Sequence, residues 1–356
     1  MKIEKLEIDN FKSLNNFKLE NPNPFSVFVG ANGVGKSNIF EALEFLNYSF
    51  SLQYPNDLFG GYKNFINVKR YNEELLFTIN FGKNFFVAYR TGPYEVNETK
   101  KKYSISIRVT EDPYDINLQK KDITKLTDSK GIVSSFVNRG AFEETLFYDQ
   151  FTEKFSRIFI NASDKKKLNT TSDNKLNLDC SNLEKVLKRI LSDDNTREEI
   201  IDWLRLFIPA FEDIQVISDE LSGTDTLLFH EKNSDKPFTK NLISDGTYNI
   251  LCLLVAVYQS NTPQFLCIEE PENGLNPYVV KELVNLFREQ CKEKGHYIWL
   301  NTHSQTLVNR LKPEEIIVVN KENGNTIAKQ FIGKDMQGMA MDTAWLTNFF
   351  GGGVPW

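Results

Sequence analysis

The residues best suited to chemistry in this sequence form a glycine-rich loop that ends in a lysine and a serine. Residues 30–37 fit the pattern G-x-x-x-x-G-K-[ST]. Glycines let backbone N–H groups curl around a phosphate, the lysine reaches the outer phosphates of a nucleotide, and the serine hydroxyl can bind Mg²⁺. The sequence therefore predicts a nucleotide site in which Lys36 also serves catalysis, made of Gly30, Ala31, Asn32, Gly33, Val34, Gly35, Lys36, Ser37 and Asn38.

The elements that must hold this loop lie on both sides of it. Residues 25–29 are a short apolar run that predicts a central strand, and residues 36–46 carry apolar side chains at helical spacing. A glycine loop without a ligand is the alternative interpretation. The order of strand, loop and helix favours the phosphate site.

Two adjacent carboxylates follow a second apolar run, residues 265–268. They are expected at the carboxyl end of a buried strand, where a doubly wound sheet places its ligand. Because burying two carboxylates without a cation is costly, we expect Mg²⁺ near Glu269, bound directly or through water. Glu270 is then the general base that polarises the attacking water. A strand end that simply meets solvent is the alternative.

One of the three histidines has a comparable setting. His303 follows the apolar run 297–300, so its side chain could hydrogen-bond a phosphate or the attacking water at the end of that strand. His230 and His296 lack such a setting and are expected at the surface.

A serine and a glycine precede the apolar helix expected over residues 248–258. The Ser244 hydroxyl and the helix start at Gly246 would present hydrogen-bond donors and the positive end of a helix dipole to a phosphate. An ordinary helix N-cap is the alternative for the same residues.

The rest of the chain shows two kinds of periodicity. Residues 74–109 alternate with a period of two and predict an antiparallel meander. Residues 183–208 carry two apolar stripes at helical spacing, which predict a helical hairpin broken at residues 192–196. The stripes either pack in the core of their own segment or form a groove for a partner.

The order of strand, helix and strand over 265–300 implies a parallel sheet, and residues 316–325 predict a final strand and hairpin.

Composition excludes several classes of protein. The chain has 356 residues and a formal net charge of -6, so bulk charge gives no reason to expect a general nucleic-acid or membrane binder, and any DNA contact must be local. The four cysteines form no C-x-x-C pair, which favours buried thiols over structural zinc. Without an apolar run long enough for a membrane span, we expect a cytoplasmic protein.

These residues together resemble a known family. Residues 8–13 are similar to the opening strand, and residues 30–37 to the phosphate loop, of ABC-type ATPases in the branch that holds the SMC, RecF and OLD proteins. The likeness is strongest to stand-alone OLD-like AAA-family ATPases of bacterial phage-defence systems. The other matching segments resemble the signature motif, the Walker B motif with its D-loop, and the switch histidine of this branch; they are residues 242–247, 269–277 and 302–305.

The resemblance implies an α/β fold: an ATPase head with a parallel-core sheet, an antiparallel β meander and a helical insertion. It divides the chain into an N-terminal ATPase lobe (1–110), a mainly helical insertion (111–210) and a C-terminal ATPase lobe (211–356). It also implies that ATP and Mg²⁺ bind, with Ser37 and Glu269 at the metal, and that Ser244 and Gly246 act on the nucleotide held by a second copy of the chain.

The function implied is that of an ATPase that forms a homodimer or higher oligomer around ATP and regulates a separate effector protein in anti-phage defence. A second interpretation is a DNA-maintenance ATPase like RecF, against which the acidic net charge counts mildly. A third is an assembly scaffold that is held together by ATP with negligible hydrolysis, against which Glu270 counts.

Overall fold

A computed structural model describes residues 3–51, 59, 61–70, 73–80, 86–97, 100–110, 153–160, 173–219, 221–336 and 338–351. Most of the predicted insertion, residues 111–152 and 161–172, lies outside the described residues. The chain forms two compact units, one made of residues 1–155 and 311–356 and the other of residues 156–310. The three-part division expected from the sequence stays a prediction.

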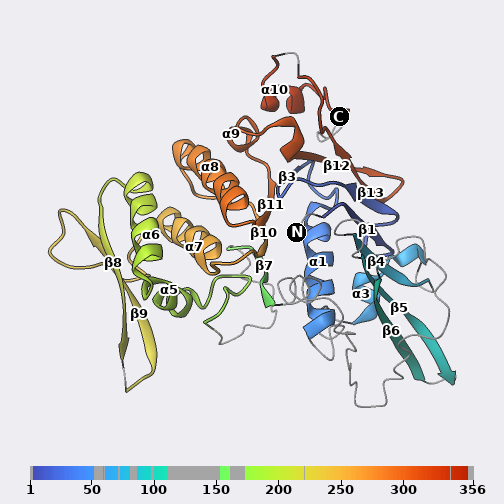
Figure 1. The fold of residues 1–356 in the computed structure, drawn as a ribbon, viewed down its shortest axis with the longest axis horizontal. Coiled ribbons are helices and arrows are strands. Elements are labelled where there is room, and N and C mark those ends of the chain that lie inside the picture. The colour runs from blue at the N-terminus through green and yellow to red at the C-terminus, as the bar shows by residue number, and fades with distance from the viewer. Residues whose placement is uncertain are drawn as a thin grey trace. The chain divides into compact units, whose positions relative to one another are not determined.

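The first unit contains a five-stranded antiparallel sheet in the order β2-β1-β4-β5-β6 (Figure 1). Each strand pairs antiparallel with its neighbours, which confirms the meander predicted for residues 74–109. The strands are β1 (Lys5–Asp9), β2 (Phe17–Glu20), β4 (Leu75–Asn80), β5 (Phe86–Asn97) and β6 (Lys100–Thr110).

Helix α1 (Lys36–Ser51) lies beside this sheet in Figure 1 and packs on it through aromatic side chains. The ring of Phe45 on α1 lies 4.5 Å from that of Phe65 and 6.1 Å from that of Phe77 on β4. Phe11, which follows β1, completes the cluster, and all four side chains are fully buried. Burying so much aromatic surface fixes the direction of α1 and thereby the loop at its start.

The same unit holds three further strands. Strand β3 (Phe25–Val29) pairs parallel with β12 (Ile316–Glu322), and β12 pairs antiparallel with β13 (Asn325–Gln330). Positive φ angles at Asn323 and Gly324 form the tight turn between β12 and β13, as the predicted hairpin requires. Short helices complete the unit: α3 (Tyr62–Phe65), η1 (Val68–Arg70), η2 (Pro313–Glu315) and α10 (Met341–Leu346).

The second unit contains the predicted parallel pair. Strand β10 (Phe265–Glu269) pairs parallel with β11 (Tyr297–Thr302), and helix α8 (Pro277–Glu293) connects them. Strand β7 (Phe155–Ile158) lies next to β10 in the order β11-β10-β7. All residues of β10 and β11 are buried. This burial explains why both sequences are apolar without alternation until the polar residues at their carboxyl ends.

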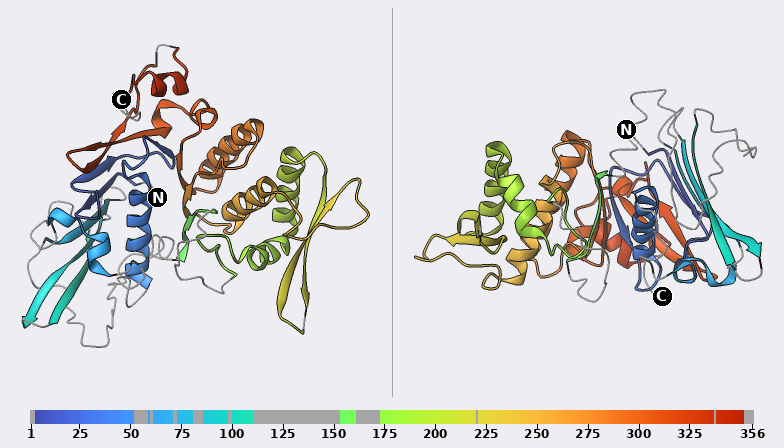
Figure 2. Two further views of the ribbon diagram at one scale, coloured as in Figure 1. Left: turned by 180° about the vertical axis from the view of Figure 1, so that it is seen from behind. Right: turned by 90° about the horizontal axis from the view of Figure 1, so that it is seen from below.

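A helical layer packs beside this pair. Helices α5 (Leu183–Leu191) and α6 (Asp194–Phe207) form the predicted hairpin, and both pack against the largely buried helix α7 (Asp245–Tyr258). Figure 2 shows α6 and α7 side by side. The apolar stripes of α5 and α6 are therefore core surface of this unit, and not a groove open to a partner.

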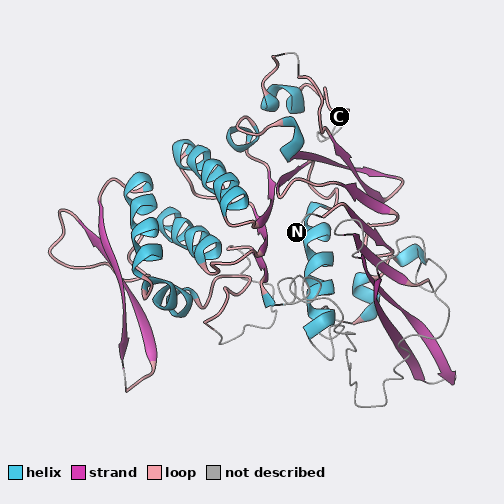
Figure 3. Ribbon diagram, in the orientation of Figure 1, coloured by secondary structure: helices cyan, strands magenta, loops and turns pink. Residues whose placement is uncertain are grey.

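The strands β8 (Phe211–Asp219) and β9 (Thr224–Glu231) form a two-stranded antiparallel sheet (Figure 3), and Phe229 on β9 also bridges to Phe238. Helices α5 and α6 both contact β8. The short helix α9 (Gln305–Val308) follows β11 and ends this unit. None of the described helices is both long and apolar enough to cross a membrane.

Candidate active site

The phosphate loop connects β3 to α1 in the first unit. Lys36 is the first residue of α1, and its buried Nζ donates hydrogen bonds to the carbonyl oxygens of Gly30, at 2.8 Å, and Ala31, at 3.1 Å. Gly33 and Gly35 have φ angles of 76° and 104°, a region that glycine adopts without the steric cost of a side chain. The loop thus curls around a buried ammonium group, as a phosphate cradle requires.

Close packing against β12 and β13 explains two of the loop glycines. A Cβ atom on Gly30 would lie 2.3 Å from the carbonyl oxygen of Val319, and one on Gly35 would lie 2.1 Å from Oγ1 of Thr326. Thr326 is fully buried and its Oγ1 donates to the carbonyl oxygen of Val34 at 2.7 Å. The loop is therefore held from outside by a hairpin that follows it by almost 300 residues in sequence.

A serine from the segment after β1 also contacts the hairpin and helix α1. The hydroxyl oxygens of Ser13 and Thr326 lie 2.6 Å apart, and Nδ2 of Asn38 on α1 donates to Oγ of Ser13 at 2.8 Å. Sequence reasoning missed both Ser13 and Thr326 as members of the site. Ser13 stands in the quoted opening segment, whereas no motif marks Thr326.

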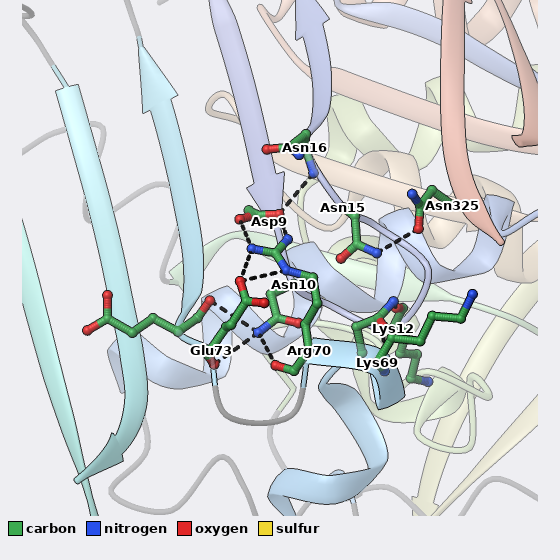
Figure 4. Close-up of polar contacts among 11 residues, drawn as sticks. Asp9, Asn10, Lys12, Asn15, Asn16, Lys69, Arg70, Glu73 and Asn325 are labelled. Atoms are coloured by element: carbon green, nitrogen blue, oxygen red, sulfur yellow. Dashed lines mark hydrogen bonds and ion pairs between the residues drawn. The ribbon is translucent and has the colours of Figure 1, made fainter. Parts of the chain in front are cut away.

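The chain just before Ser13 is fixed by polar contacts with η1 and the residues after it (Figure 4). Asn10 is fully buried with a φ angle of 67°, and its Nδ2 donates to the carbonyl oxygens of Arg70, Glu73 and Glu74 at 3.0 to 3.2 Å. Nη1 of Arg70 lies 2.6 Å from Oδ1 of Asp9. These contacts hold the end of β1 in place and thereby position Ser13 against the loop.

The buried carboxylate of the second unit has a cation that the sequence did not reveal. Glu269 ends β10 with 5% of its surface exposed, and Oε1 accepts two hydrogen bonds from the Arg157 guanidinium, one from Nε at 2.7 Å and one from Nη2. Oε2 accepts from Nδ2 of Asn301 at 3.3 Å. Arg157 on β7 thus balances a charge for which we had expected Mg²⁺ alone.

Substituting Arg157 with methionine should destabilise the second unit strongly. The change keeps much of the side-chain volume but leaves Glu269 buried without its cation, and breaking a buried pair in this way typically costs about 3–5 kcal/mol. Urea denaturation measures the loss. The double variant Arg157→Met with Glu269→Gln removes both charges and should recover most of the stability; if it is no more stable than Arg157→Met alone, the ion pair is not the cause.

The second carboxylate, Glu270, stands in a strained turn directly after β10. Its φ angle is 49°, unusual for a residue with a side chain, and such strain gathers at functional sites. Its backbone N–H donates to Asn301 at both the carbonyl oxygen (3.0 Å) and Oδ1 (3.1 Å). Oε2 of Glu270 accepts from Nδ2 of Asn273 at 2.9 Å. The half-buried side chain is thus fixed at the end of the strand.

His303 lies at the neighbouring strand end, as predicted, with an exposed side chain. Its backbone N–H donates to Oε1 of Glu272 at 3.0 Å, and the same oxygen accepts from Oγ1 of Thr302 at 2.7 Å. Burial raises the pKa of Glu272 above its ordinary value, and the hydrogen bond from Thr302 offsets only part of that rise. The second unit therefore brings Glu269, Glu270 and His303 together at the carboxyl ends of two parallel strands.

The expectation that His296 lies at the surface is wrong. Its side chain is fully buried, because the turn at Gly295, with a φ angle of 69°, directs the chain straight into the buried strand β11. His230 on β9 is half-buried.

The start of α7 packs against the loop after β10. Ser244 is an exposed N-cap whose Oγ accepts from the N–H of Thr247 at 3.2 Å. Its contact with a phosphate stays a prediction. A Cβ atom on Gly246 would lie 2.7 Å from the carbonyl oxygen of Gly274. Nδ2 of Asn249 donates to the carbonyl oxygen of Asn273 at 2.8 Å. The exposed Ser244 hydroxyl and the carboxylate turn are therefore parts of one packed structure.

The chemistry of these residues fits a nucleotide that brings its own Mg²⁺. No group of three or more His, Cys, Asp or Glu side chains among the described residues could hold a metal ion by itself. Mg²⁺ bound with a nucleotide takes most of its ligands from phosphate oxygens and water, with one or two ligands from the protein. Ser37 in the first unit and Glu269 in the second each carry an oxygen of the kind that Mg²⁺ binds.

The two strand ends, the phosphate loop and the surrounding fold define an AAA-type ATPase domain of the α/β class. The chain belongs to the family described as "AAA domain, putative AbiEii toxin, Type IV TA system", which it matches over residues 25–309.

Solved Smc head domains share this fold. An Smc head bound to the C-winged helix domain of ScpA is 18% identical, with a TM-score of 0.58 over 92% of this chain and 98% of that one. An Smc head domain with an extended coiled coil, bound to the C-terminal domain of ScpA derived from Pyrococcus furiosus, is 15% identical, with a TM-score of 0.53 over 98% of this chain and 99% of that one. At these identities the likeness concerns the fold alone.

Proposed function

We propose that this chain binds ATP with Mg²⁺ and hydrolyses it, and that a second copy completes each nucleotide site. The observation that carries the proposal is the buried ammonium of Lys36, enclosed by a loop in which Gly33 and Gly35 adopt positive φ angles. Such a loop should bind a phosphate group favourably, because the phosphate oxygens would accept hydrogen bonds from the ammonium and from the backbone amides of the loop.

In the proposed reaction, a water molecule attacks the γ-phosphorus of ATP while Glu270 accepts a proton from it. The bond between the γ-phosphorus and the bridging oxygen breaks, and ADP leaves with the electron pair. Lys36 stabilises charge on the outer phosphates, and His303 hydrogen-bonds the γ-phosphate or the water. Mg²⁺, held with help from Ser37 and Glu269, would neutralise charge on the phosphate oxygens.

The contribution of a second copy rests on the start of α7. Ser244 and the backbone at Gly246 would act on the phosphate bound by the partner chain, so that ATP joins two subunits into a homodimer or a higher oligomer. The exposure of Leu242, at 67%, supports this proposal, because a large apolar side chain beside the signature residues would lose water in the dimer.

Sedimentation velocity tests this assembly. The wild-type chain should sediment as a monomer without nucleotide and as a dimer or larger species with Mg²⁺ and a slowly hydrolysed ATP analogue. The variant Ser244→Arg places a bulky cation at the proposed contact and should remain monomeric while it still binds nucleotide. A dimer of unchanged strength in Ser244→Arg would contradict the assignment of this surface.

We further propose that the ATPase regulates a separate effector protein in anti-phage defence. The family description, which names a toxin and a type IV toxin–antitoxin system, supports a role within a system of several components. The Smc heads of the same fold that were solved with ScpA support the idea that such a head can hold a partner protein. The purified chain should not cleave DNA or RNA with ATP and Mg²⁺, and it should copurify with the product of an adjacent gene.

A further inference from the structure

A third carboxylate of the same region has no role in the proposed reaction. Glu272 lies two residues after Glu270, and its Oε1 accepts both hydrogen bonds that reach it from the end of β11, from Oγ1 of Thr302 (2.7 Å) and from the N–H of His303 (3.0 Å). Its Oε2 is buried and has no hydrogen-bond partner among the described residues. Glu272 therefore contacts the strand end through one oxygen that acts only as an acceptor.

Two links join the turn after β10 to the end of β11. Asn301 is the first: it accepts from the N–H of Glu270 and donates to Glu269. Glu272 is the second, and it reaches the residues that carry the histidine. Asn301 holds the start of the turn, and Glu272 ties the turn to the backbone at His303.

The hydroxyl of Thr302 extends the second link. While Oγ1 donates to Glu272, it accepts from the N–H of Ser304 at 2.9 Å, and Ser304 in turn caps α9 by accepting from the N–H of Leu307 at 3.2 Å. The chain on both sides of His303 is thereby tied to one carboxyl oxygen. A side chain on a backbone held at two points has less freedom to leave its place.

We propose that Glu272 is a positioning residue, which holds the backbone at His303 so that the imidazole and the Glu270 carboxylate keep a fixed spacing. This inference rests on the proposed ATPase function for its catalytic consequence, although the positioning itself does not depend on hydrolysis. The two contacts require a hydrogen-bond acceptor at Oε1 but do not require a negative charge. The side-chain amide of a glutamine should therefore hold the backbone at His303 equally well.

The variants Glu272→Gln and Glu272→Ala separate these requirements. Glutamine keeps an acceptor oxygen, so Glu272→Gln should hydrolyse ATP within about two-fold of wild type. Alanine removes it, and kcat should fall by on the order of 10²-fold, the loss that a displacement near 1 Å can cause. KM should change little, because the loss falls on the transition state. Glu282→Ala is the matched control, since Glu282 accepts a hydrogen bond from Asn285 and is not among the buried residues of α8.

A second readout does not need hydrolysis. The imidazole signals of the three histidines can be followed by NMR in protein labelled with ¹³C-histidine, and a His303→Gln variant assigns the signal of His303. Glu272→Ala should shift or broaden that signal and leave His230 unchanged, whereas Glu272→Gln should resemble wild type. Should Glu272→Ala fail to fold, Thr302→Val removes one donor while keeping the shape, and should shift the same signal.

The two readouts distinguish the possible failures. If wild type hydrolyses no ATP yet the His303 signal responds as expected, the proposed function is wrong and the positioning role stands. An unshifted His303 signal together with wild-type kcat in Glu272→Ala would overturn the positioning role. A glutamine variant as impaired as the alanine variant would overturn it equally, because charge would then be what the site needs.

Discussion

The variant Glu270→Gln should bind ATP with Mg²⁺ as well as wild type does and turn it over about 10²- to 10⁴-fold more slowly, the usual cost of losing a general base. The amide has almost the shape of the carboxylate but cannot accept the proton of the attacking water. The strained backbone at Glu270 and its contacts with Asn301 involve main-chain atoms, so they survive the substitution. Single-turnover measurement of phosphate release gives the rate directly.

The same variant should trap the assembled state, because ATP that is not hydrolysed keeps joining the subunits. Its dimer with ATP should persist far longer than that of wild type in sedimentation experiments. Glu293→Gln, at the exposed end of α8, is the control and should behave as wild type. Hydrolysis by Glu270→Gln at the rate of wild type would remove Glu270 from the reaction, and equally stable dimers of both proteins would favour the ATP-held scaffold.

Substituting Lys36 with alanine should abolish ATP binding and leave the fold intact. The Nζ of Lys36 already lies inside the loop, where two carbonyl oxygens hold it, so its cost of ordering is small and its attraction to a phosphate is large. Loss of the ammonium leaves the loop with uncharged donors alone. Equilibrium titration with a fluorescent ATP analogue measures the affinity, and circular dichroism checks the fold.

Lys329→Ala provides the comparison for that experiment. Lys329 on β13 belongs to the same unit, and its Nζ donates to the carbonyl oxygen of Gly351, so the variant loses a lysine without touching the loop. It should bind ATP normally. Undiminished affinity in a folded Lys36→Ala protein would show that the phosphate loop is not the nucleotide site.

Local patterns made much of this fold predictable. The phosphate loop, the strand before it and the helix after it occupy a single stretch of sequence, and their periodicity and glycine spacing are properties of neighbouring residues. The parallel pair β10 and β11 was predictable for the same reason, because the apolar runs 265–268 and 297–300 are separated by a pattern of helical spacing. The helical hairpin followed from two apolar stripes.

Contacts between distant segments were not predictable. Ser13 and Thr326 are 313 positions apart, and Arg157 and Glu269 are 112 positions apart, so no spacing pattern in one sequence can pair them. A lone arginine in a strand of four residues looks like a solvated charge. The same limit explains the error at His296, because burial of a residue beside a strand depends on what the rest of the chain places over it.

Two further residues of the site were missed. Glu272 stood inside the motif 269–277, and Asn301 lies between the run 297–300 and the motif 302–305. The side chains of both act on backbone atoms of the neighbouring strand end. Sequence reasoning assigned functions to the residues that could touch a ligand. It had no means of assigning those that hold the ligand-binding residues in place.

Release of inorganic phosphate by the purified wild-type chain tests the central claim most directly. With ATP and Mg²⁺, phosphate should accumulate linearly with time and in proportion to protein, and it should fall to background in Lys36→Ala and by at least about 10²-fold in Glu270→Gln. Phosphate release that persists unchanged in both folded variants would contradict the account, as would a wild-type protein that binds ATP but releases no phosphate with or without its partner.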